Sequence, residues 1–116
     1  MEWKVETNDL LYDSNKSIIR QDNPPEFLIG SPINGEVVHL AFPIPLNDSI
    51  LTDCCKFSRN IQTEFEKNNI KVTFEADCRY HIDGETILWL NDLQQIWRYL
   101  TGRELCVDIT NIQKYI

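Results

Sequence analysis

The chain has 116 residues and carries 18 acidic against 11 basic side chains, a formal net charge of −7. This length is typical of one domain, and the 42% hydrophobic fraction is that of an ordinary globular protein rather than of a disordered chain. We therefore expect residues 1–116 to form a single globular domain. The negative charge repels phosphate backbones, so it disfavours nucleic-acid binding and favours contact with cationic surfaces.

The sequence predicts neither a membrane helix, which needs roughly 18 consecutive apolar residues, nor a signal peptide. Residues 1–5 lack the basic start and the apolar core of such a peptide. We therefore expect a cytoplasmic protein with no membrane partner. In a reducing compartment we expect free thiols at the cysteines, which are Cys54, Cys55, Cys78 and Cys106.

The N-terminal part predicts short strands separated by polar turns. Residues 2–7 alternate apolar and charged side chains, and residues 18–19 belong to a second candidate strand. Asn34-Gly35 is a turn signal between the apolar runs 27–33 and 36–42. We therefore expect these two runs to pair as antiparallel strands.

Two amphipathic helices are predicted further along the chain. In the first, apolar residues recur at intervals of three and four, and they are Ile50, Cys54, Phe57, Ile61 and Phe65. We expect this helix to end at Asn68-Asn69. The second helix spans about residues 92–101, with Asn91 as its cap and Gly102 at its C-terminal end. Its predicted buried stripe is formed by Leu93, Ile96, Trp97 and Leu100.

Residues 70–82 alternate apolar and polar side chains, which predicts one long strand with a buried face. Asp83-Gly84 then favours a two-residue type I′ turn into a returning strand. With this turn Tyr80 lies opposite Ile87, and Cys78 lies opposite Trp89.

Residues 105–109 alternate again and predict a final strand, followed by a helical turn or a frayed tail at 111–116. The predicted order is strands, helix, strands, helix, strand. This order indicates an α+β fold with a mainly antiparallel sheet of about five to six strands and two helices packed on one face.

No metal-binding or catalytic motif has the required spacing. The chain has no Cys-x-x-Cys or His-x-x-x-His pair, and its four glycines all fall at predicted turns or a helix end, so no phosphate-binding loop can be drawn. Cys55, His39 and His81 are the groups from which a small hydrolase site would have to be built. We predict no cofactor, no metal and no enzymatic activity.

Acidic and aromatic side chains instead predict a protein-binding surface. Carboxylates gather around the predicted hairpin, and Tyr99 lies off the apolar stripe of its helix. An aromatic anchor inside a charged rim is typical of binding hot spots. The candidate partner-binding residues are Tyr12, Glu75, Asp77, Arg79, His81, Asp83, Glu85, Asp92 and Tyr99.

In size, acidity and lack of catalytic motifs the chain is similar in general character to bacterial immunity proteins, although no stretch carries the motif of a named family. The leading hypothesis is an inhibitor that covers the active site of a basic toxin domain, such as a nuclease, with carboxylates. The alternative is a subunit or adaptor of a larger protein complex, and the third hypothesis is the small hydrolase. No pattern indicates an oligomeric state.

Overall fold

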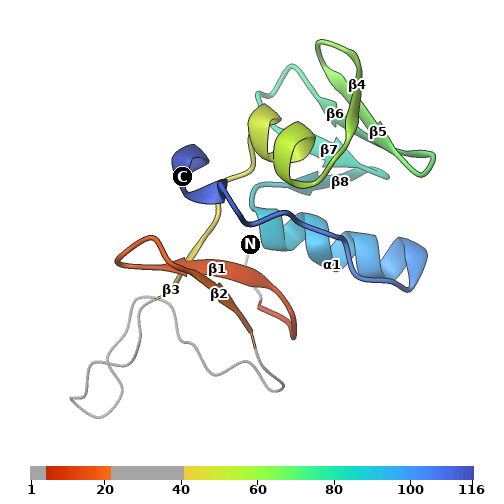
Figure 1. The fold of residues 1–116 in the computed structure, drawn as a ribbon. Helices are drawn as coiled ribbons and strands as arrows, with labels where there is room; N and C mark the ends of the chain where they lie inside the picture. The colour runs from red at the N-terminus through yellow and green to blue at the C-terminus, as the bar shows by residue number, and fades with distance from the viewer. Residues whose placement is uncertain (1–4, 22–40) are drawn as a thin grey trace.

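The computed structural model describes residues 5–21 and 41–116. Within these ranges the chain forms two antiparallel sheets, one long helix and two short helical segments (Figure 1). The α+β class and the antiparallel pairing are confirmed. The strands are divided between two sheets, however, and a single long helix takes the place of the two that were predicted.

The smaller sheet has the strand order β2-β1-β3. Its strands are β1 (Leu10–Asp13), β2 (Ile18–Arg20) and β3 (Ala41–Pro43). In the central strand Leu11 pairs with Ile19 on one side and with Pro43 on the other. The strand predicted at residues 18–19 is thus present. Residues 5–7 of the strand predicted at 2–7 are not in a strand, and most of the pair predicted from 27–33 and 36–42 lies outside the described residues.

The larger sheet is a meander in which five consecutive strands lie side by side. The strands are β4 (Ser58–Ile61), β5 (Glu64–Lys67), β6 (Ile70–Phe74), β7 (Tyr80–Ile82) and β8 (Glu85–Ile87). Asp83 and Gly84 have φ values of 49° and 79° in the turn between β7 and β8. Positive φ at both central residues is the type I′ geometry, which matches the twist of paired strands. The predicted turn is confirmed, as is the pairing of Tyr80 with Ile87.

The helix predicted over residues 50–65 is wrong. Only η1, a π-helix over Ile50–Cys54, is helical in this range. Lys56 has a φ of 62°, which carries the backbone out of the helical region, and the chain then enters the β4–β5 hairpin. Phe65 is buried on the inner face of β5, whereas Ile61 is exposed at the end of β4. A helical face would have buried both.

The single strand predicted over residues 70–82 is also wrong. The chain reverses between Glu75 and Arg79, where the Glu75 amide donates a hydrogen bond of 3.0 Å to the Arg79 carbonyl. β6 and β7 consequently pair with each other, with Phe74 opposite Tyr80. Cys78 lies in this reversal, exposed, instead of opposite Trp89.

The second predicted helix is confirmed as α1 (Leu90–Thr101), which ends at Gly102 with a φ of 69°. Its cap differs from the prediction. The Asp92 carboxylate accepts hydrogen bonds from the amides of Leu88 and Trp89, at 2.9 and 3.0 Å, so the helix is capped from its own first turn and Asn91 lies inside it. Figure 1 shows α1 between the two sheets, where it contacts β1 and β8.

The strand predicted at residues 105–109 is absent, and its predicted alternation of buried and exposed side chains is only partly present. Leu105 is buried and Ile109 is exposed, but the segment pairs with neither sheet. The Asp108 amide instead donates to the Cys54 carbonyl at 2.8 Å. The chain then closes with η2, a 3-10 helix over Ile112–Tyr115 that contacts η1.

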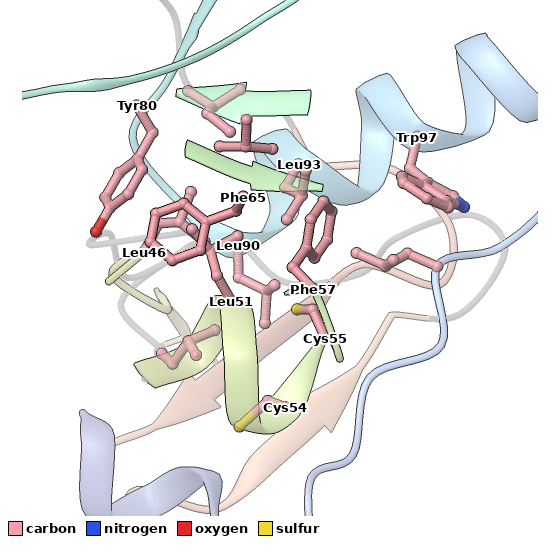
Figure 2. Close-up of a cluster of buried hydrophobic side chains, with 14 of the residues drawn as sticks. Leu46, Leu51, Cys54, Cys55, Phe57, Phe65, Tyr80, Leu90, Leu93 and Trp97 are labelled. Atoms are coloured by element: carbon pink, nitrogen blue, oxygen red, sulfur yellow. The ribbon is translucent and has the colours of Figure 1, made fainter. Parts of the chain in front are cut away.

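The core lies between the meander, η1 and α1. Figure 2 shows Leu51 of η1, Phe65 of β5 and Leu90 and Leu93 of α1 meeting in one cluster. Trp97 closes one side of this cluster with its ring edge-on to Phe57, at a centroid distance of 5.8 Å. Packing from three elements fixes α1 against the sheet, which positions the surface described below.

The type I′ turn at Asn68-Asn69, with φ values of 51° and 65°, gives a stability test of the meander. We expect Asn69→Val to lower the free energy of unfolding by about 1–2 kcal/mol, because a β-branched residue is strained at positive φ. Asn69→Gly should stay within about 0.5 kcal/mol of the wild type. Urea denaturation measures the free energy of unfolding of both variants, provided that its dependence on urea concentration stays the same as in the wild type. Equal stability of the two variants would contradict the turn geometry.

Candidate functional site

A groove lies between the C-terminal half of α1 and the turn that joins β7 to β8. It consists of two adjoining hollows of about 440 and 470 Å³, which share Asp83 and Leu100. Apolar side chains from three elements line it, and they are Ile70, Ile82, Ile96 and Leu100. Tyr99 and Glu85 complete its rim beside Asp83. We term this surface the Tyr99 groove.

The orientation of α1 about its own axis leaves this groove open. Gln94 is buried because its side chain accepts a hydrogen bond from the Leu10 amide, at 2.8 Å, and donates one to the Asn8 carbonyl, at 3.2 Å. With this polar residue facing inward, the side of α1 that carries Leu100 turns toward solvent. Leu100 keeps 36% of its surface exposed and Tyr99 keeps 87%.

The charges on the rim of the groove are mainly negative. In the described part of the chain, the side chains of Asp83 and Glu85 have no hydrogen-bond or ion-pair partner. The C-terminal end of α1, next to Tyr99, adds the partial negative charge of its free carbonyl groups. Lys71 also lines the groove, but its Nζ atom lies 3.9 Å from Glu64 Oε1, which offsets its charge.

Four other predicted residues lie together on β7 and in the turn before it: Glu75, Asp77, Arg79 and His81. We term them the His81 cluster. His81 Nε2 lies 2.9 Å from Asp77 Oδ2, and His81 Nδ1 lies 3.9 Å from Glu75 Oε2. Desolvation raises the pKa of Asp77, but hydrogen bonds from His81 and the Arg79 amide together outweigh it and hold this pKa below its usual range. The cluster therefore compensates much of its own charge.

The remaining two predicted residues lie apart from both groups. The Asp92 carboxylate is occupied by the cap of α1. Tyr12 belongs to the smaller sheet, where its ring packs against Phe42 at a centroid distance of 5.5 Å. The structure therefore divides the predicted residues among several locations and brings Asp83, Glu85 and Tyr99 together in the Tyr99 groove.

The sequence reasoning missed the apolar part of the groove. The sequence pattern places Ile96 and Leu100 in the buried stripe of the helix and Ile70 on the core face of a long strand. One signal was present, since Ile96 and Leu100 are one turn apart on the side of α1 away from Gln94. That signal points to a groove only once the burial of Gln94 is known.

A polar hollow of about 320 Å³ lies between η1 and the C-terminal segment. Its charged groups already contact one another. Tyr115 donates a hydrogen bond to Asp53, and Lys56 Nζ lies 3.8 Å from Asp108 Oδ2. This hollow therefore presents little net charge to a ligand.

The hydrolase hypothesis loses its candidate nucleophile. Cys55 has no exposed surface, and burial raises the pKa of its thiol to about 12, so it carries no thiolate at neutral pH. His39 lies outside the described residues. In residues 5–21 and 41–116, no three His, Cys, Asp or Glu side chains are placed to hold a metal ion, and no helix has the length and apolarity to cross a membrane.

Thiol reactivity tests this arrangement of the cysteines, all of which are free. We expect the exposed Cys78 and Cys106 to react in the folded protein, and the buried Cys54 and Cys55 to react only after unfolding in urea. An aromatic disulfide reagent, followed by absorbance, measures both phases. The double variant Cys78→Ser/Cys106→Ser is the control. A fast phase in this variant while its circular dichroism remains native would contradict the burial of the other two thiols.

Comparisons with known proteins bring no family assignment to this geometry. No family model, no curated protein and no solved structure matches the chain. The chemistry of the Tyr99 groove is therefore the main indication of what the protein binds.

Proposed function

We propose that the protein is a small acidic inhibitor of the immunity type, which acts in the cytoplasm on a cationic protein such as a nuclease toxin. The observation that carries this proposal is the Tyr99 groove, where an exposed tyrosine adjoins apolar side chains and carboxylates without a partner in the described residues. Tyrosine anchors surrounded by a polar rim are typical of the residues that dominate protein interfaces.

The proposed mechanism has two stages. The net charge of −7 first attracts the basic surface of the partner and raises the association rate. Tyr99 then anchors in a pocket of the partner, while Asp83 and Glu85 pair with lysine or arginine side chains that would otherwise hold the phosphate of a substrate. Inhibition follows because the basic residues are occupied.

The alternative function, a subunit or adaptor of a larger complex, is favoured by a different feature. All four residues of the edge strand β4 are exposed, and an exposed edge can accept a further strand from another chain. The bulge between Arg59 and Ile61 disturbs this edge, however, and bulges reduce strand addition. The groove is therefore the stronger basis for a proposal.

Inhibition and its salt dependence test the proposed function. The immobilised full-length chain is used to retain basic proteins from the native cell, and each retained protein is purified and assayed with and without the chain. We expect one of them to lose its activity on binding. Raising the salt from well below to well above physiological ionic strength should weaken this complex by about tenfold or more, mainly through slower association.

Calorimetry and stopped-flow mixing measure the two effects. An affinity that stays flat across the salt range would contradict electrostatic steering. A retained protein that binds tightly but keeps full activity would contradict inhibition and would support the adaptor function.

A further inference from the structure

The apolar lining of the Tyr99 groove is open to a ligand side chain. Ile96 and Ile70 are only partly buried, and Leu100 is exposed although it lies one turn from the core residue Trp97. These side chains come from α1 and β6, which are fixed by the core, so the lining is preformed. A preformed apolar lining favours an apolar side chain or the hydrocarbon stem of a long one.

The charge around this lining selects the end group of the ligand. Asp83 and Glu85 lie on the rim, and the C-terminal end of α1 points its partial negative charge toward the same region. Arg98, the basic residue in the last turn of α1, does not neutralise this end, because its guanidinium is bound to Asp9 and Glu104 at 2.7 and 2.8 Å. The complementary end group is a cation.

The exposed ring of Tyr99 favours arginine over lysine as the ligand residue. With 87% of its surface exposed, Tyr99 has a free ring face beside the carboxylates. A guanidinium group is planar, stacks on aromatic rings and can bond a carboxylate with two parallel N–H groups. An ammonium group lacks the planar shape and is more strongly hydrated.

We infer that the Tyr99 groove recognises an arginine followed by an apolar residue on the partner's surface. The guanidinium stacks on Tyr99 and bonds Asp83 or Glu85, and the apolar neighbour packs on Leu100 and Ile96. This inference rests on the proposed function, in that it specifies the chemistry by which a basic partner is held.

The probe for this recognition is a short peptide with one central Arg-Leu pair among glycine and serine residues. Amide NMR of the isotope-labelled full-length chain gives both the location and the affinity of binding. We expect the shifted amides to cluster at Asp83, Tyr99 and Leu100. Replacing the arginine by its neutral analogue citrulline should weaken binding by about tenfold or more, and replacing it by lysine should give an intermediate affinity.

Matched variants locate the effect within the chain. The double variant Asp83→Asn/Glu85→Gln should weaken binding of the arginine peptide by about tenfold. Asparagine is chosen at position 83 because it tolerates the positive φ of the turn. Tyr99→Ala should weaken peptide binding to a similar extent. Glu75→Gln/Asp77→Asn removes the same charge from the His81 cluster, and Ile61→Ala removes another exposed apolar side chain. Both controls should stay within about twofold of the wild type.

Three outcomes would overturn the inference: no binding of the arginine peptide, equal binding of the citrulline peptide, or shifts that map to the His81 cluster. They are distinguishable from failure of the proposed function. If a captured toxin is inhibited and still binds Tyr99→Ala, then inhibition stands and the arginine recognition fails. If the peptide binds the groove but no captured protein is inhibited, then the recognition stands and the inhibitor function fails.

Discussion

The ion pair between the buried Asp9 and the partly buried Arg98 is the constraint on which the arrangement of the helix depends. Asp9 has no exposed surface, and its carboxylate accepts hydrogen bonds from Arg98, at 2.7 Å, from Gln95, at 2.8 Å, and from the Glu6 amide, at 2.8 Å. Burial raises the pKa of Asp9, and these three contacts act in the opposite direction. A buried carboxylate is costly without such partners, so the N-terminal segment and α1 must stay in register.

This register decides which side of α1 faces water. Arg98 and Gln94 both turn toward the N-terminal segment, and the helix therefore buries polar side chains that an amphipathic pattern would expose. As a consequence, Ile96 and Leu100 lie at the margin of the buried face of α1. The exposed apolar surface beside Tyr99 is thus the counterpart of a buried polar contact on the opposite side of the same helix.

Local turn and cap chemistry explains which parts of the fold could be predicted. Asp83-Gly84 and Gly102 have backbone angles that their residue types favour, and the β7–β8 hairpin and the end of α1 were predicted correctly. The reversal at Gln62-Thr63 has no comparable signal. Because no residue type marks that turn, the apolar residues at intervals of three and four predict a helix. Asn68-Asn69 then reads as the end of this helix rather than as a second type I′ turn.

The candidate site was predictable only in part, for the same reason. Tyr99 was identified because its position off the apolar stripe depends on helix geometry alone. The separation of Asp83 from Asp77 depends on the reversal between Glu75 and Arg79, which contains neither glycine nor proline. The burial of Gln94 depends on a partner 84 residues away in the sequence, which no local pattern encodes.

The two walls of the Tyr99 groove differ in how far along the chain their contacts reach. The β7–β8 wall belongs to a meander in which every strand pairs with its neighbour in sequence, so each of its hairpins closes a short loop at low entropic cost. The orientation of the α1 wall is fixed by contacts between Gln94 and the amide of Leu10, near the other end of the chain. Closing that long loop costs more entropy than any hairpin of the meander. The surface that we assign to recognition is therefore complete only when the segment around Leu10 has met α1.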